Sequence, residues 1–134
     1  MRVALDTNVV ASAIGTRGLC ADVLRVVLVE HELVIGEHVL TELRNNLARK
    51  FRLPAALIAE NETLLRARAT VVEDATPMTI PGVDAGDARV LGDAAAGSAD
   101  VFVTGDRALQ AIGKRAPVPV LSPRQFWMLL RGEG

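Results

Sequence analysis

The chain has 134 residues, of which 50% are hydrophobic and 23% are charged, a composition that excludes an intrinsically disordered protein. A formal net charge of −1 excludes a uniformly basic nucleic-acid-binding surface. This net charge is still compatible with a local stripe of basic residues beside an acidic pocket. Cys20 is the only cysteine, which excludes an intramolecular disulfide and suits a reducing cytoplasm. The first residues lack the layout of a signal peptide and no apolar run could span a bilayer, so we expect one cytoplasmic domain over residues 1–134.

Short apolar segments alternate with longer segments of helical periodicity along the chain. The expected strands are residues 3–5, 33–35, 70–72, 101–103 and 118–121. The expected helices are residues 8–14, 20–30, 37–50, 54–69, 87–96, 107–112 and 123–130, and the longest expected loop is 74–86. This alternation predicts an α/β fold, with a parallel sheet covered by helices on both faces.

Two acids follow directly after expected strands. Asp6 comes after residues 3–5, and Asp106 comes after residues 101–103 through Thr104 and Gly105. Ligands of open α/β sheets bind beyond the carboxyl ends of the strands, which would aim both carboxylates at one site. Each acid could instead cap the helix that follows it, and the local pattern leaves both interpretations open.

Two further acids belong to expected helices. Asp87 begins a helix with an inward apolar stripe, although capping is the commoner reason for an acid at a helix start. Glu42 lies off the edge of an apolar stripe, where a solvated helix face is the default interpretation. Pattern alone therefore favours a structural role for both.

Together, the four acids would repel one another strongly unless a cation lay among them. Mg²⁺ and Mn²⁺ prefer oxygen ligands, and a pair of such ions about 4 Å apart can activate water and stabilise the leaving oxygen of a phosphodiester. No zinc site is expected, because His31 and His38 stand apart and are interpreted as surface histidines. The sequence has no phosphate-binding loop and no serine-nucleophile motif, so we expect a metal-dependent enzyme.

Four motifs occur in an order and spacing that resemble those of PIN-domain ribonucleases. They are Leu5-Asp6-Thr7-Asn8, Thr41-Glu42-Leu43, Asp84-Ala85-Gly86-Asp87 and Thr104-Gly105-Asp106-Arg107. The segment from Val118 to Phe126 resembles the end of a bacterial, VapC-like branch whose members are toxins of toxin–antitoxin systems. The resemblance covers nearly the whole chain, and it rests on the set of motifs because Asp-Thr-Asn alone is a weak signal.

The resemblance implies a three-layer α/β/α sandwich with four to five parallel strands, and an endoribonuclease that uses Mg²⁺ or Mn²⁺. The implied catalytic and metal-binding residues are Asp6, Glu42, Asp87 and Asp106, and the implied assisting residues are Asn8, Ser12 and Thr104. It also implies an RNA substrate, a homodimer and a small antitoxin partner. This chain departs from the branch at Gly86, where an acid is usual, which favours a single tightly held ion.

Basic residues close to the acids are candidates for contacts with the RNA backbone, although a solvated helix face needs no such function. They are Arg44, Arg49, Lys50, Arg52 and Arg107.

Three other functions remain open at this point. A haloacid-dehalogenase-like phosphatase also has an acid after its first strand, but it needs a second Asp where Asn8 stands. A receiver-type signalling module needs paired acids near the first strand and a late lysine, which are absent here. A catalytically idle PIN-like binding protein is disfavoured only weakly, because all four acids are present.

Overall fold

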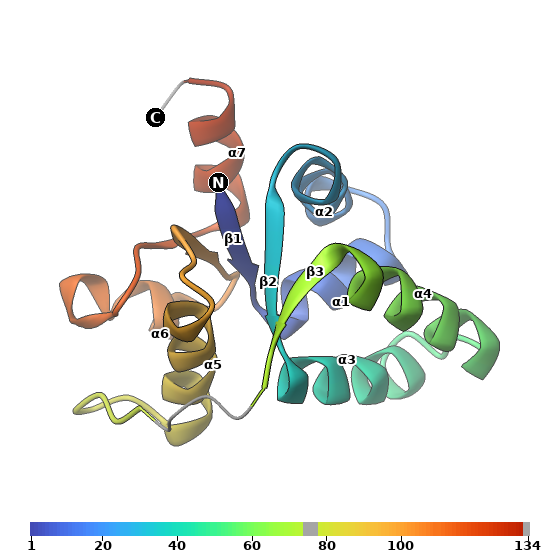
Figure 1. Cartoon of the computed structure of the whole chain (residues 1–134), viewed down its shortest axis with the longest axis horizontal. Helices are drawn as coiled ribbons and strands as arrows, with labels where there is room; N and C mark the ends of the chain where they lie inside the picture. The colour runs from blue at the N-terminus through green and yellow to red at the C-terminus, as the bar shows by residue number, and fades with distance from the viewer. Residues whose placement is uncertain (74–77, 133–134) are drawn as a thin grey trace.

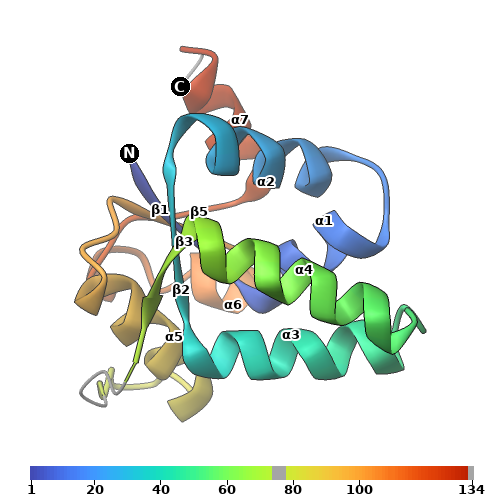
Figure 2. The same cartoon turned by 45° about the vertical axis from the view of Figure 1, so that its right-hand side comes forward.

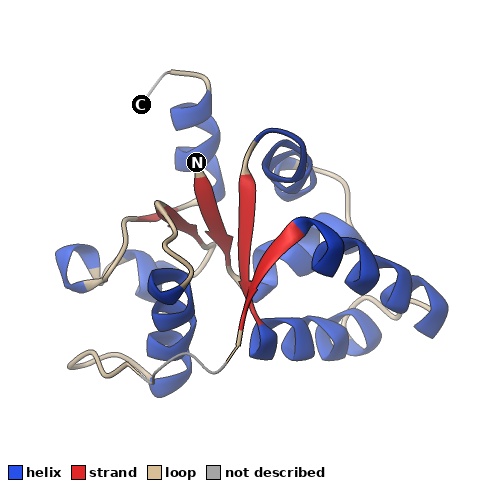
Figure 3. Cartoon of the chain, viewed as in Figure 1, coloured by secondary structure: helices blue, strands red, loops and turns tan. Residues whose placement is uncertain are grey.

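The computed structural model describes residues 1–73 and 78–132. These residues contain one five-stranded sheet with helices on both of its faces (Figures 1 and 3). The strands are β1 (Arg2–Leu5), β2 (Glu32–Gly36), β3 (Ala69–Val72), β4 (Val101–Val103) and β5 (Val120–Leu121). They lie in the order β3-β2-β1-β4-β5 and every neighbouring pair is parallel. The predicted parallel sheet of four to five strands is confirmed.

The helices follow the predicted pattern closely. They are α1 (Thr7–Gly15), α2 (Leu19–Glu30), α3 (Glu37–Arg49), α4 (Ala55–Arg68), α5 (Ala85–Ala96), α6 (Arg107–Gln110) and α7 (Pro123–Leu130). The helix expected over residues 107–112 ends at Gln110, and a 3₁₀ turn that was not predicted follows at Gly113–Arg115. Gly113 has a φ of +61°, in the left-handed region, which is incompatible with continuing the helix. Of the loop expected at 74–86, residues 74–77 lie outside the described part of the chain.

The sheet separates two apolar cores because successive residues of each strand point to opposite faces. Val3 and Leu5 of β1 belong to one core, with α1 to α4 and α7, and Ala4 belongs to the other, with α5 and α6. Figure 1 shows α5 and α6 on the side of the sheet opposite α1 to α4, and Figure 2 shows α3 and α4 lying side by side. The predicted three-layer sandwich is therefore confirmed. No helix within the described residues has the length and apolar character needed to cross a membrane.

The strand register brings distant residues to the same edge of the sheet. Leu5 of β1 pairs with Val103 of β4, so the next residues, Asp6 and Thr104, emerge side by side. The Asp6 backbone N–H donates to the Val103 carbonyl at 2.9 Å and extends this pairing by one step. The carboxyl edge of the sheet thus presents polar groups from two sequence segments almost 100 residues apart.

Candidate active site

Asp6 is a buried carboxylate held from two sides. It is 9% exposed, its Oδ1 accepts from the Thr7 backbone N–H at 2.8 Å, and its Oδ2 accepts from the Thr104 hydroxyl at 2.6 Å. Burial raises the pKa of the Asp6 carboxyl, and the charges of Asp106 and Glu42 raise it further, whereas the two hydrogen bonds act in the opposite direction. The result is a fixed carboxylate in surroundings that disfavour its negative charge.

Thr104 connects Asp6 to Asp106. Its side chain is fully buried, and its hydroxyl oxygen accepts from the Asp106 backbone N–H at 3.0 Å while the hydroxyl donates to Asp6. Asp106 also caps α6, because its Oδ1 accepts from the Ala108 N–H at 2.8 Å. The two interpretations of Asp106 are therefore compatible: one oxygen caps the helix, and the residue remains exposed at the edge where Asp6 lies.

Thr7 connects Asp6 to Glu42 in a similar way. Its backbone N–H binds Asp6, and its hydroxyl donates to Glu42 Oε2 at 3.1 Å. Glu42 is exposed on α3, as its helical position predicts, yet this contact turns it toward the edge of the sheet. The role of Thr7 was missed in the sequence, although it stands in the middle of the Asp6-Thr7-Asn8 motif.

Asp87 approaches the same region from α5. Asp84 caps this helix by accepting from the Gly86 N–H at 3.0 Å, which leaves Asp87 in the first turn. Burial raises the pKa of the Asp87 carboxyl, and the negative charges of Asp106, Asp84, Asp6 and Glu42 raise it further, in that order. Asp6, Glu42 and Asp106 therefore lie close enough to Asp87 for their charges to raise its pKa.

The donor chemistry of this region fits a hard divalent cation. Within residues 1–73 and 78–132, no lysine or arginine forms an ion pair with Asp6, Glu42, Asp87 or Asp106. The same residues contain no group of three His, Cys, Asp or Glu side chains that could hold a metal ion as they stand. Mg²⁺ commonly takes only one or two carboxylates directly and keeps several waters, so an open acidic site still fits this ion.

The other two predicted assisting residues are less engaged than Thr104. Asn8 is exposed, and Ser12 is half-buried in α1. No side-chain hydrogen bond joins either of them to the four acids in the described part of the structure.

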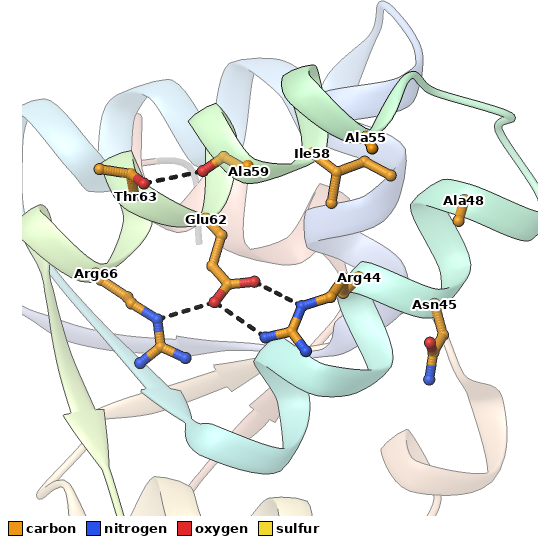
Figure 4. Close-up of a pocket in the computed structure, with 9 residues that line it drawn as sticks. All are labelled: Arg44, Asn45, Ala48, Ala55, Ile58, Ala59, Glu62, Thr63 and Arg66. Carbon is orange, nitrogen blue, oxygen red and sulfur yellow. Dashed lines mark hydrogen bonds and ion pairs between the residues drawn. The ribbon is translucent and has the colours of Figure 1, made fainter.

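Arg44 differs from the other candidates for RNA contact. Its guanidinium donates through Nε to Glu62 Oε1 at 2.9 Å and through Nη2 to Glu62 Oε2 at 3.0 Å, and Glu62 also accepts from Arg66 (Figure 4). These residues line a pocket of about 600 Å³ between α3 and α4 that none of the four acids lines. Arg44 is therefore committed to a surface ion-pair cluster. The remaining candidates are all exposed: Arg49, Lys50, Arg52 and Arg107.

The interpretation of His38 as an ordinary surface residue is wrong. Its side chain is only 17% exposed, and its Nδ1 lies 2.8 Å from Oδ2 of Asp93 on α5. His31 is half-buried, and its Nδ1 lies 3.3 Å from the N-terminal amino group of Met1. Periodicity could not reveal the His38 contact, because the sequence offers no signal that links two residues on different helices.

Comparisons with known proteins bear on this geometry. The chain is similar to a chain in the crystal structure of VapBC2 from Rickettsia felis bound to a DNA fragment from the promoter of these proteins. The sequence identity is 18%, the TM-score is 0.64, and the match covers 91% of this chain and 98% of the other. It is also similar to PAE2754 from Pyrobaculum aerophilum, with 21% identity, a TM-score of 0.66, and coverage of 98% and 90%. No match was found among curated protein sequences. The family model described as PIN domain matches residues 2–108, which contain all four acids and the threonines that connect them, and the chain belongs to the PIN domain family.

Proposed function

We propose that this protein is a metal-dependent endoribonuclease with its active site at the carboxyl edge of β1 and β4. The observation that carries this proposal is the buried Asp6 carboxylate, which has two hydrogen-bond donors, acidic neighbours and no cationic partner among the described residues. Such a site is costly in free energy for the folded protein alone, and a bound cation removes the cost. Members of the PIN domain family are generally nucleases, which agrees with this chemistry.

Asp6, Asp87 and Asp106 are the residues that would hold Mg²⁺ or Mn²⁺, directly or through water, and Glu42 would hold a second ion or orient the attacking water. A divalent ion bound at this site lowers the pKa of a coordinated water and offsets the charge that develops on the phosphoryl group. Thr104 and Thr7 keep the carboxylates of Asp6 and Glu42 in place through their hydroxyl groups.

The partners of the protein are part of the proposal. Arg49, Lys50, Arg52 and Arg107 are exposed, and we assign them to contacts with the phosphates of the RNA backbone. The structural similarity to VapBC2 of Rickettsia felis supports the toxin role in a toxin–antitoxin pair, with a small antitoxin protein as partner. A homodimer as the active form is a further part of the proposal. We also propose that residues 1–134 act as a single domain in the cytoplasm.

A ribonuclease assay tests the proposal. The purified protein should cleave RNA with Mg²⁺ or Mn²⁺ and lose this activity with EDTA, and Asp6→Asn should reduce it by at least about a hundredfold while folding is kept. Asp6→Asn, purified in parallel, also controls for contaminating ribonuclease, and Asp22→Asn controls for the loss of one acidic side chain, because Asp22 forms a surface pair with Arg25 on α2. Equal activity in all three preparations would contradict the proposal.

A second candidate function is an idle PIN-like protein that only binds partners. It is favoured by the finding that no three metal-binding side chains in the described chain are arranged to hold an ion. A calorimetric titration with Mn²⁺ separates the two: heat that vanishes in Asp6→Asn supports the nuclease, and a flat trace with the wild-type protein supports the idle protein.

A further inference from the structure

A buried polar contact joins α3 to α5 at a place that the proposed reaction does not use. Asp93, in the second half of α5, is 6% exposed, and its Oδ2 lies 2.8 Å from His38 Nδ1 in the first turn of α3. No other ion pair or side-chain hydrogen bond links these two helices within the described residues. The two helices are the ones that carry Glu42 and Asp87.

Burial of this contact has a cost in stability. Burial raises the pKa of the Asp93 carboxyl, and only His38 and Arg89 counteract this effect. His38 Nε2 is buried without a hydrogen-bond partner in the part of the chain described, and Asp93 Oδ2 has no polar neighbour there apart from its contact with His38 Nδ1. Buried polar atoms without such partners destabilise a fold, and an apolar pair of similar size would serve packing better.

The backbone around the contact is shaped for it. Gly36 ends β2 and precedes α3, and a Cβ placed on it would lie 2.1 Å from Asp93 Oδ2. The Asp93 carboxylate therefore occupies the space where the side chain of any other residue at position 36 would begin. It also lies at the N-terminal end of α3, where the helix dipole favours negative charge and no side chain of α3 caps the helix.

We propose that His38 and Asp93 are positioning residues, which set α5 relative to α3 and thereby set the separation of Asp87 from Glu42. Glu42 is one helical turn beyond His38 on α3, and Asp87 is six residues, or about 9 Å, before Asp93 on α5. An apolar helix face allows small shifts along the sheet, whereas a close contact between two buried polar groups favours one arrangement. This inference rests on the proposed function, because its consequence is the affinity of the acidic site for a divalent ion.

The experiment measures Mn²⁺ affinity by calorimetry for the wild-type protein, Asp93→Ala, His38→Leu and the double variant. Asp93→Ala and His38→Leu should each weaken Mn²⁺ binding by about three- to thirtyfold. The double variant should bind Mn²⁺ no more weakly than the single variant with the lower affinity, because both substitutions break the same contact. Asp93→Asn keeps the shape and an oxygen for His38, so it should restore most of the affinity. If Asp93→Ala fails to fold, His38→Leu and Asp93→Asn still decide the question.

Glu73→Gln is the matched control. Glu73 lines the same pocket of about 340 Å³ as His38 and Asp93, and the substitution removes one negative charge from this pocket, as Asp93→Ala does. It should bind Mn²⁺ like the wild-type protein, and an equal loss of affinity would show that only the local charge matters. Normal Mn²⁺ affinity in all variants, with lowered unfolding temperatures, would reduce the contact to a purely structural one and overturn the proposal. A wild-type protein that binds no Mn²⁺ would instead refute the proposed function and remove the basis of this inference with it.

Discussion

The most informative stability experiment is the Asp6→Asn substitution, measured with and without Mn²⁺. Asp6 is buried beside acidic neighbours, so its pKa in the folded protein is raised and its ionised form costs stability at neutral pH. The substitution removes this charge and keeps a side-chain oxygen that can accept from the Thr7 N–H. Without metal, Asp6→Asn should therefore unfold at a higher temperature than the wild-type protein.

With Mn²⁺ the order should reverse. At an ion concentration of about 100 times Kd, binding to the folded state adds about 2.7 kcal/mol of stability. An unfolding entropy of about 2.1 cal/mol/K per residue for the 134 residues converts this to a rise of about 10 °C in Tm. If Asp6→Asn weakens binding about a hundredfold, the same concentration adds about 0.4 kcal/mol, or about 1.5 °C.

Differential scanning fluorimetry of the EDTA-treated proteins, before and after Mn²⁺ addition, measures both effects. Asp22→Asn should shift with Mn²⁺ as the wild-type protein does, because its carboxylate lies in a surface pair with Arg25. The reasoning is refuted if Mn²⁺ stabilises wild-type and Asp6→Asn proteins equally, or if Asp6→Asn is the less stable protein in EDTA.

Two further predictions follow from the same site, and a third follows from the contact between His38 and Asp93. Because the pKa values of Asp6 and Asp87 are raised in the folded state, their stability cost is present at neutral pH and is relieved as the pH falls through the folded pKa. The gap in Tm between the metal-free wild-type and Asp6→Asn proteins should therefore close between pH 7 and mildly acidic pH. Because protons also compete with the ion, the Mn²⁺-induced rise in Tm should shrink over the same pH range. Gly86→Asp should increase the number of Mn²⁺ ions bound per chain in calorimetry, since a Cβ there meets only Asp84 Oδ2, at 3.1 Å; an unchanged stoichiometry would argue against a second ion. Gly36→Ala should displace the Asp93 side chain and destabilise the protein by about 1–3 kcal/mol in urea unfolding. A variant as stable as the wild-type protein would show that Asp93 can move aside without a cost in stability.

The strands could be predicted from the sequence because each is a short apolar run between polar or glycine-containing segments. Residues 3–5 and 101–103 are recognisable as strands because all of their side chains are apolar, and the parallel pairing follows from the helices between the strands. The resemblance of the motifs to those of PIN-domain ribonucleases, and not periodicity, was the basis for grouping the four acids as a candidate site. Pattern alone could not place Glu42 in the site, because its contact with Thr7 depends on the packing of α3 against α1.

The unpredicted features are side-chain contacts between separate elements. His38 and Asp93 are 55 residues apart, and neither their periodicity nor their local sequence distinguishes them from surface residues. The ion pair of Arg44 with Glu62 likewise depends on how α3 and α4 pack, so the sequence could mark Arg44 only as a candidate for a phosphate contact or as part of a solvated helix face. Sequence patterns report on backbone structure and burial, while such pairings arise only from the complete fold.

The location of a bound ion tests the central claim most directly. Crystals of the protein soaked in Mn²⁺ should give an anomalous difference peak within about 2.2 Å of an Asp6 carboxylate oxygen, with Asp87 or Asp106 as a second ligand or joined to it through water. Crystals of Asp6→Asn soaked in the same way should lack this peak. A manganese peak at another place on the chain, or none at the edge of β1 and β4 under saturating Mn²⁺, would contradict the account.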